Sequence, residues 1–476
     1  MNAPVSTSTP PAPTSHPVPE LELSEALIRK FNRTGPRYTS YPTADRFQGR
    51  YPASAYLAQL HARAAASNPP PLSVYVHLPF CESLCYFCAC NKIITTDHGK
   101  AAGYLEMLYA EMALIGAELG LHRSTVQLHL GGGTPTFLSA EELTELMEQL
   151  RRHFEFTPDA ELGVEIDPRT VTPQSLAMLA GLGFNRTSFG VQDFNPDVQK
   201  AVNRIQPYEM VRTALQAARD NGFGSINTDL IYGLPRQTLA SFGHTLDQLV
   251  SLSPDRIALY NYAHLPERFK AQRLINPDEL PSAETRLQIF MLSMQKLLDA
   301  GYVYIGLDHF AKPEDELNRA RLSGGLHRNF QGYTTRAECD LVGLGISAIG
   351  KIGNAYIQNQ HMRKPWAEAI QSGELPTSKG LDLSTEDVLR REVIMDIMCG
   401  KRIDFAAFSA RHGLDFRQHF AAELEALQPH IAAGLLDVDS EHLAIRPKGR
   451  LFVRALAMAF DEYLGKPRTA TYSKLI

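Results

Sequence analysis

Short apolar runs and amphipathic stretches alternate along the chain from about residue 72 onward. The apolar runs predict six strands, at 72–78, 126–130, 161–166, 186–191, 225–231 and 256–262. Six βα units with right-handed crossovers form a parallel sheet, which is either open or curled into a partial barrel. The pattern therefore predicts an α/β fold, a partial (β/α)6 barrel, with its functional site at the carboxyl ends of the strands.

The stretches between these runs have the spacing of helices that pack on a sheet. Between the second and third strands, Ser139 and Glu142 form a capping box that precedes an apolar helical stripe. A longer connecting segment follows the sixth strand. It leads to a helix with an apolar stripe from Leu287 to Leu298, and then to a strand-like run at 302–307. Each helix is expected to bury one face against the sheet.

The N-terminal part of the chain lacks this alternation. Residues 1–20 are rich in proline, serine and threonine, and they have neither a basic start nor an apolar core. We expect a disordered tail there, not a signal peptide. Residues 21–65 should form an arm that packs near the active site, extended around Pro36 and Pro42. The barrel is assigned to 66–362.

Beyond about residue 363 the strand pattern stops, and we assign a mainly α-helical C-terminal domain to 363–476. The expected elements are helices at 384–399, 405–413 and 419–434, short strands at 435–438 and 443–445, and a last helix at 449–464. Their order resembles a winged helix, a form often used on DNA. The mixed charges of this segment favour a lid packed on the catalytic domain instead.

Composition narrows the class of protein. The chain has 476 residues, 44% hydrophobic and 21% charged, with a net charge of −5, which is typical of a soluble protein with more than one domain. We expect no membrane span, and the mild acidity argues against general nucleic-acid binding. Crowded cysteines without a secretory signal favour a reducing cytoplasm over disulfides.

Three cysteines, Cys81, Cys85 and Cys88, lie on one loop directly after the first predicted strand. A [4Fe–4S] cube bound by four cysteines typically carries electrons, whereas one bound by three leaves an iron open for a substrate or cofactor. The spacing therefore predicts a cluster that does chemistry at iron.

Cys90, two residues further on, leaves an alternative open. With the other three thiols it could bind zinc, but structural zinc usually takes two separated ligand pairs, and here all four thiols lie within ten residues. Cys90 could also be a buried small residue or a participant in radical chemistry. We do not count it as a cluster ligand.

Unusual residues also follow the other predicted strands. They are Gly131–Gly133 with Thr134 after the second, Glu165 and Asp167 at the third, Gln192 and Asp193 at the fourth, Asp229 within the fifth and Asn261–Ala263 at the sixth. Glycines after a buried strand let a ligand approach the backbone. The run matches neither a Walker loop nor a dinucleotide fingerprint.

Together these features resemble the radical S-adenosylmethionine (SAM) superfamily. Residues 75–81, Cys90 with its neighbours Asn91 and Lys92, and residues 35–43 resemble the oxygen-independent coproporphyrinogen III oxidases in particular. The similarity continues through 184–186, 190–194, 229–235, 262–266 and 327–333, and so covers nearly the whole chain after the tail.

The resemblance implies a function. Members of this family convert two propionates of coproporphyrinogen III to vinyl groups without oxygen, which gives protoporphyrinogen IX for haem synthesis. SAM would complete the cluster's coordination, and its reductive cleavage would give a 5′-deoxyadenosyl radical that abstracts hydrogen from a propionate. The resemblance also implies a low-potential electron donor such as flavodoxin or ferredoxin, and a monomeric protein.

The resemblance further implies residue roles. Cys81, Cys85 and Cys88 would bind the cluster, and Tyr75 and Phe87 would lie beside SAM. Gly132, Gly133 and Thr134 would meet the polar end of SAM, and Glu165 would bind its ribose hydroxyls. Its other contacts would be Gln192, Arg204 and Asp229. A second SAM molecule would contact Ala263 and Ile349. Tyr75 and Cys90 are the candidate catalytic residues.

The substrate carries four carboxylates, for which arginine is the best-suited cation. The candidates are Arg33, Arg37 and Arg328, with Gln331 and Tyr333 against the macrocycle.

Two other functions stay open. Paralogues of the family bind and deliver haem, although Cys90, the arm, Gln331 and Ile349 match the enzymes better. A zinc-stabilised scaffold would need no SAM.

Overall fold

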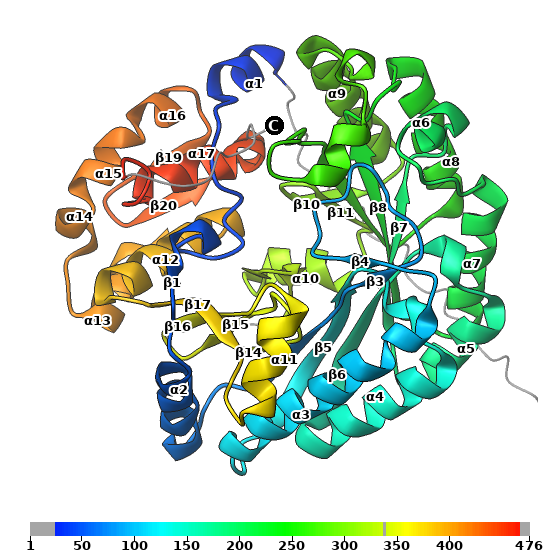
Figure 1. Cartoon of the computed structure of the whole chain (residues 1–476). Helices are drawn as coiled ribbons and strands as arrows, with labels where there is room; N and C mark the ends of the chain where they lie inside the picture. Colours follow the sequence, from blue (N-terminus) through cyan, green and yellow to red (C-terminus); the bar gives the residue numbers. More distant parts are fainter. Residues whose placement is uncertain (1–23, 337–338, 467–476) are drawn as a thin grey trace, which may run out of the picture.

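A single curved sheet organises the barrel. The computed structural model describes residues 24–336 and 339–466, so the tail expected at 1–20 lies outside the described residues. The sheet has 13 strands in the order β1-β17-β16-β15-β14-β2-β5-β6-β7-β8-β9-β11-β10. Helices cover its outer side, and the C-terminal helices face its inner side (Figure 1).

The six predicted strands are present and form the parallel core of the sheet. They are β2 (Leu72–Leu78), β5 (Ser124–Gly132), β6 (Glu155–Ile166), β7 (Arg186–Gln192), β8 (Ser225–Tyr232) and β9 (Arg256–Asn261). Neighbours pair in parallel in chain order, and β14 (Asp340–Leu344) pairs in parallel with β2 as a seventh strand. The α/β class and the partial barrel are confirmed.

The outer helices are α3 (Ala102–Glu118), α4 (Ala140–His153), α5 (Pro173–Gly181), α6 (Pro196–Ala201), α7 (Tyr208–Asp220), α8 (Leu239–Leu252) and α9 (Ala283–Asp299). Most of them begin at a side chain that caps them, and α3 and α7 are the exceptions among those described. The capping box at Ser139 and Glu142 is present at the start of α4. Buried Leu143, Leu146 and Leu150 face the sheet from α4, as expected from the helical stripe.

The inner face of the sheet is polar. Along β7 and β8 the fully buried positions, such as Phe189 and Leu230, alternate with partly buried ones, such as Ser188 and Asp229. Successive side chains of a strand point to opposite faces, so the apolar set packs under the helices and the polar set faces the barrel interior. The interior is therefore a space for ligands and not a packed core.

Antiparallel strands extend the sheet at both edges. At one edge these are β15 (Ile349–Ile352), β16 (Ala355–Asn359), β17 (Thr377–Asp382) and β1 (Gln48–Gly49), and at the other β11 (His309–Ala311) and β10 (Val303–Gly306). The expectation that strands stop at residue 363 is wrong, because β17 follows α11 (Arg363–Gln371) and pairs with β16. The domain limits themselves stay a prediction.

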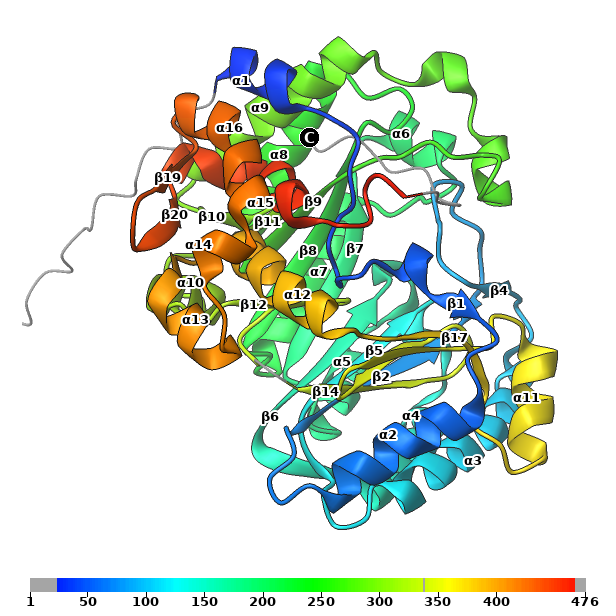
Figure 2. The ribbon, with the colours of Figure 1, turned by 90° about the vertical axis from the view of Figure 1, so that its left-hand side faces the viewer.

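The N-terminal arm runs between the barrel and the C-terminal helices (Figure 2). It contains α1 (Glu25–Phe31) and, after an extended segment, α2 (Ala53–Ala65). Arg454 donates from Nε to the carbonyl oxygen of Pro36 at 2.9 Å, and the Tyr38 hydroxyl donates to Asp461 at 2.8 Å. The arm is thus held by residues more than 400 positions away.

The C-terminal region is mainly helical. Its helices are α12 (Thr385–Met398), α13 (Phe405–His412), α14 (Phe416–His419), α15 (Ala421–Ala426), α16 (Gln428–Ala432) and α17 (Val453–Ala457), with a small antiparallel sheet of β18 (Ile403–Asp404), β20 (His442–Ile445) and β19 (Leu436–Val438).

Two helix predictions in this region are wrong. The segment 419–434 is broken into short helices, and Pro429 lies at the first turn of α16. The segment 449–464 forms 3₁₀ turns around the short α17, and not one helix. There Gly449 packs so closely on Leu435 that a Cβ atom would lie 1.9 Å from the Leu435 carbonyl oxygen.

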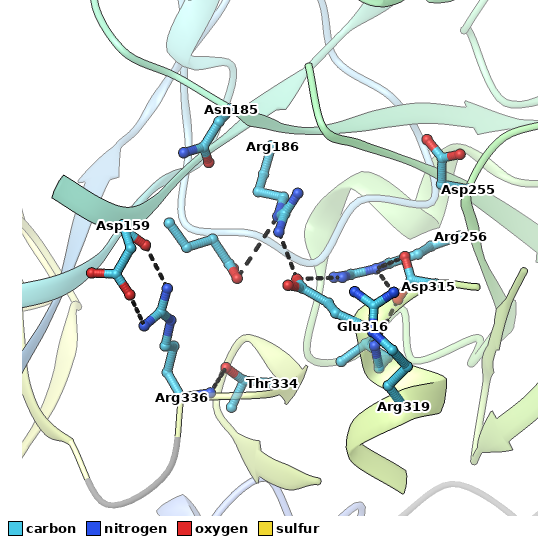
Figure 3. A network of polar contacts seen from close by, with 12 residues as sticks. Asp159, Asn185, Arg186, Asp255, Arg256, Asp315, Glu316, Arg319, Thr334 and Arg336 are labelled. Atoms are coloured by element: carbon cyan, nitrogen blue, oxygen red, sulfur yellow. Dashed lines mark hydrogen bonds and ion pairs between the residues drawn. The ribbon is translucent and has the colours of Figure 1, made fainter. Parts of the chain in front are cut away.

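Figure 3 shows a network of ion pairs at the end of the barrel where the strands begin, whereas the cysteine loop follows the end of β2. Arg186 and Arg256, the first residues of β7 and β9, both donate to Glu316 at the start of α10 (Glu316–Ser323), at 2.7 and 2.8 Å. Arg256 also reaches Asp315 at 2.9 Å, and Arg336 pairs with Asp159 at 3.0 Å. Because most of these side chains are largely buried, the network fixes the floor of the barrel.

No helix in the described part of the chain is both long and apolar enough to cross a membrane.

Candidate iron–sulfur and cofactor site

The cysteine loop lies at the carboxyl end of β2. Its two ends are joined by the short parallel strands β3 (Phe80–Cys81) and β4 (Ile93–Ile94). Cys81, Cys85 and Cys88 line one cavity of about 520 Å³. All three are free thiols, which is the donor set that a cluster with one open iron requires.

The same cavity brings together most of the residues predicted from sequence. Besides the three cysteines, its wall includes Phe87, Cys90, Gly132, Gly133, Thr134, Glu165, Gln192, Arg204 and Asp229. Among the described residues, no group of three or more histidine, cysteine, aspartate or glutamate side chains is already arranged to hold a metal ion. The fit to a cluster rests on the three thiols and the cavity in front of them.

Two arginines converge on Cys85. Arg204 donates from Nη1 to Cys85 Sγ at 3.4 Å, and Arg169 donates from Nη2 at 3.6 Å. Asp167 accepts from both arginines, at 2.8 and 2.6 Å. Burial would raise the pKa of Asp167, but the two guanidinium groups outweigh it and hold this pKa below its usual range. The cluster side of the cavity is therefore cationic, which suits anionic thiolates.

The other thiols lie in different environments. Burial raises the pKa of Cys81 to about 11, although the Thr134 hydroxyl lies 3.5 Å from its sulfur. A hydrogen bond from the Cys90 thiol lowers the pKa of Cys88 to about 6 and raises that of Cys90 well above its usual value. Cys90 is accessible from the cavity, so the structure places it beside a predicted ligand and not in the core.

The glycine segment fits tightly between β2 and β6. A Cβ atom on Gly133 would lie 2.6 Å from the backbone of Pro79, and Gly132 has a φ of +113°. The Gly132 N–H donates to Glu165 at 3.1 Å, and the Gly133 N–H donates to the Leu78 carbonyl at 2.8 Å. These glycines therefore serve backbone packing first, with one side open to the cavity.

Two carboxylates, Glu165 on β6 and Asp229 on β8, line the cavity from either side of β7. Burial would raise the pKa of Glu165, but hydrogen bonds from the His129 ring at 3.2 Å and from Gly132 outweigh it and lower this pKa. Burial, together with the nearby Glu165, raises the pKa of Asp229 to about 6. Ser188 and Asn227 hold Asp229 in place at 3.1 and 2.8 Å.

Two buried polar atoms in the cavity wall have no partner within the described chain. These are Gln192 Oε1 and Arg204 Nε. Gln192 also has a φ of +66° at a bulge that ends β7. Strained backbone positions cluster at active sites and ligand-binding sites, and a buried polar atom without a partner needs an explanation, which a bound ligand would supply. These two atoms fit a polar cofactor beside the thiols.

Tyr75, Ala263 and Ile349 lie outside this cavity wall. The Tyr75 hydroxyl donates to His77 Nδ1 at 3.1 Å, because His77 Nε2 is used by the Asn91 carbonyl, and burial raises the pKa of Tyr75. Gln272 donates both to the Ala263 carbonyl, at 3.2 Å, and to the Phe87 carbonyl, at 3.1 Å. Ile349 begins β15 and is partly buried. Tyr75 and Ala263 are thus linked to the cysteine loop by these hydrogen bonds.

The candidate substrate arginines differ in position. Arg33 is exposed at the end of α1. Arg37 forms an ion pair with Asp308 and lies over the Tyr260 ring at 5.8 Å. Arg328, on β12 (His327–Asn329), lies over the Tyr333 ring at 5.0 Å. Arg37 and Arg328 are thus on the inner side of the barrel, whereas Arg33 is not.

Sequence reasoning missed Arg169 as part of this site. The Asp167-Pro168-Arg169 turn directly after β6 was the available signal, since the aspartate was already noted at the strand end. The contact of Arg169 with Cys85 spans 84 positions and could not be inferred from local pattern.

Known proteins of one family match this chain over nearly its whole length. The Radical SAM superfamily matches residues 75–249, and the HemN C-terminal domain matches 383–452. The oxygen-independent coproporphyrinogen III oxidase of Pseudomonas aeruginosa is 47% identical over 94% of this chain and 98% of its own length. The enzyme of the same name from Escherichia coli is 45% identical over 96% of this chain and 100% of its own length.

A solved structure supports the same relationship. Coproporphyrinogen III oxidase (HemN) from Escherichia coli, described as a radical SAM enzyme, has a TM-score of 0.88 at 44% identity, and covers 93% of this chain and 100% of its own. The parallel strands and the cysteine loop of the structure agree with these comparisons. The chain belongs to the oxygen-independent coproporphyrinogen III oxidase family of the radical SAM superfamily.

Proposed function

We propose that this protein converts coproporphyrinogen III to protoporphyrinogen IX without oxygen, by oxidative decarboxylation of two propionates to vinyl groups. The observation that carries this function is the cavity that joins three free thiols to the polar interior of the barrel. The identity of the substrate is inferred from the family, whose members match this chain over nearly its full length.

Cys81, Cys85 and Cys88 would hold one [4Fe–4S] cluster, and the cavity beside them would hold SAM. When bound, the reduced cluster and SAM supply the 5′-deoxyadenosyl radical that removes a hydrogen atom from a propionate. The protein itself binds and orients these groups and excludes water.

Individual side chains suit particular parts of SAM. Glu165 lies on the cavity wall, and its lowered pKa keeps the carboxylate charged, so that it can accept hydrogen bonds from ribose hydroxyls. Gln192 Oε1 and Arg204 Nε are free to bind its polar groups. Gly132, Gly133, Thr134 and Asp229 complete the wall, with Phe87 at its apolar side.

Further parts of the assignment rest on the family resemblance. A second SAM molecule would lie towards Ala263 and Ile349. Tyr75 and Cys90 would act near the chemistry, and Cys90 is supported by its position beside Cys88 on the cavity wall. A flavodoxin or ferredoxin would deliver electrons to a monomeric, cytoplasmic enzyme.

An anaerobic assay tests this function against haem delivery. The reconstituted protein is given SAM, a reductant and coproporphyrinogen III, and protoporphyrinogen IX and CO₂ are measured. We expect both products. Stable haem binding and no product from protein with an intact cluster would favour the haem chaperone instead.

A further inference from the structure

A second large cavity lies between the C-terminal helix α12 and the hairpin of β12 and β13 (Gly332–Thr334). Its volume is about 490 Å³. The wall carries more cations than anions: Arg328, Arg336, Lys351, Arg391, Lys401 and Arg411 against Glu392 and Asp396. A positive cavity of this size suits an organic anion.

Two of these cations keep hydrogen-bond donors unused. Arg328 Nε and Nη1 and Arg391 Nη1 are buried and have no acceptor among the described residues. The others in the cavity differ: Lys401 pairs with Asp396 at 3.2 Å, and Arg411 pairs with Glu392. Leaving a charged donor buried without a partner costs free energy, so a ligand that accepts from both arginines would stabilise the site.

The two arginines come from elements that are fixed to each other. On α12, the residues that line the cavity are Val388, Arg391, Glu392, Met395 and Asp396, which share one helix face by their spacing of three and four. The Tyr333 hydroxyl donates to the Met398 carbonyl at 2.7 Å and so ties the hairpin to the end of α12. Arg328 lies over the same Tyr333 ring.

This cavity adjoins the interior of the barrel. It shares Asn329 and Thr334 with the cavity of the barrel interior. The interior cavity in turn shares Glu165, Ser188 and Asp229 with the cavity of the cysteine loop. The three cavities therefore form a series of neighbours from the cysteine loop to Arg328, as a ligand that spans the barrel would require.

The surroundings of Arg328 are also positive. Burial, with Arg37 and Arg328 nearby, lowers the pKa of Arg454 to about 9. Burial and the same two arginines lower the pKa of His309 to about 3, so this ring is neutral and does not add charge. The carboxylate of Asp308 pairs with Arg37. The positive charge around Arg328 thus exceeds what the nearby protein groups neutralise.

We propose that Arg328 and Arg391 together form a carboxylate-binding subsite, which holds a propionate of the substrate other than the one that reacts. This inference rests on the proposed function. The planar guanidinium groups present paired donors to a carboxylate, and a substrate with four propionates supplies carboxylates at several positions around one macrocycle. The C-terminal region then contributes to substrate binding through Arg391.

Fluorescence titration with coproporphyrin III, the stable oxidised form of the substrate, tests the subsite on the cluster-loaded protein. Arg328→Gln and Arg391→Gln should each weaken binding about ten-fold or more, and raise the KM for coproporphyrinogen III more than they lower kcat. The control Arg446→Gln removes an exposed arginine of the same region, paired with Asp437, and should bind as the wild type does. Wild-type affinity in either Gln variant would overturn the subsite.

A second measurement does not depend on how a variant folds. The wild type should bind coproporphyrin III at least about ten-fold more tightly than its tetramethyl ester, which lacks the charges. Equal affinities would overturn the inference. Arg391→Lys keeps the positive charge but lacks the paired N–H donors of a guanidinium group, so it should bind coproporphyrin III with intermediate affinity. Failure of the wild type to make protoporphyrinogen would refute the proposed function, whereas these titrations judge the subsite alone.

Discussion

Arg204 donates a hydrogen bond to Cys85 Sγ at 3.4 Å, across 119 positions of sequence. The same Nη1 atom donates to Asp167 at 2.8 Å, and Nη2 donates to the Gly190 carbonyl at 2.7 Å. One guanidinium group thus links the cysteine loop to the ends of β6 and β7. Its Nε atom is buried and has no partner in the described chain.

Arg204→Gln should leave the cluster in place but change its properties. Loss of a positive donor beside a thiolate destabilises the reduced, more negative cluster, so its reduction potential should become more negative. SAM affinity should fall about ten-fold or more, because a charged hydrogen bond is lost. Redox titration followed by electron paramagnetic resonance, and SAM binding by equilibrium dialysis, measure these effects.

The control for this variant is Arg212→Gln, since Arg212 is exposed on α7 and pairs only with the exposed Glu209 at 2.6 Å in the described structure. A potential and a SAM affinity equal to those of the wild type in Arg204→Gln would contradict the assigned role.

Cys81→Ser and Cys90→Ser should show which of these cysteines binds the cluster and which only lies beside it. Cys81→Ser removes one of three thiolates and should abolish the cluster, as measured by iron content and visible absorbance. Cys90→Ser should retain the cluster, because Cys90 is not one of the three. A cluster that survives the first substitution, or is lost in the second, would show that the ligand set is wrong.

Gly133→Ala should destabilise the protein by about 1–3 kcal/mol, the usual cost of forcing an extra methyl group into a packed site. The added Cβ would lie 2.6–2.7 Å from the backbone of Pro79 and Phe80. Urea unfolding measures the change. Gly181→Ala is the matched control, since a Cβ there meets nothing within 4 Å, and it should cost little or stabilise. Equal stabilities in the two variants would contradict the close packing.

Glu111 should make stability depend on pH. This buried carboxyl on α3 accepts from the Gly345 N–H at 2.8 Å and the Trp366 ring N–H at 3.1 Å, and burial raises its pKa from 4.5 to about 7. A raised acid pKa means that the folded state binds the proton more tightly. The stabilisation is therefore present below about pH 4.5 and is lost as pH rises to about 7, by about 3 kcal/mol.

Glu111→Gln cannot ionise at this position. Urea unfolding between pH 5 and 8 should therefore show the wild type losing stability relative to Glu111→Gln as pH rises, with no further change above about pH 7.5. A stability difference that stays constant over this range would refute the prediction.

The strands and their polar ends were predictable because they depend on local pattern. The run at 72–78 has the bounds of β2, and Glu165, Gln192 and Asp229 line one cavity because parallel strands bring their ends to one edge. β17 was missed, since the run Thr377–Asp382 is short and mixed in polarity, and it becomes a strand only by pairing with β16.

Side-chain contacts between residues far apart in the chain could not be predicted from the sequence pattern. Arg391 lies next to Arg390 in one helix, yet Arg390 pairs with Glu386 and Glu423, and Arg391 faces a cavity. Helical spacing gives the face that each residue occupies, but not which element packs against it. The partners of Arg204 and Arg169 were hidden for the same reason.

Deuterium transfer tests the central claim most directly. Coproporphyrinogen III labelled with deuterium on the propionate carbons is incubated anaerobically with the reconstituted protein, SAM and reductant. The account predicts deuterium in the 5′-deoxyadenosine formed, together with protoporphyrinogen IX and two CO₂ for each product molecule. Unlabelled 5′-deoxyadenosine, or SAM cleavage without loss of CO₂, would contradict it.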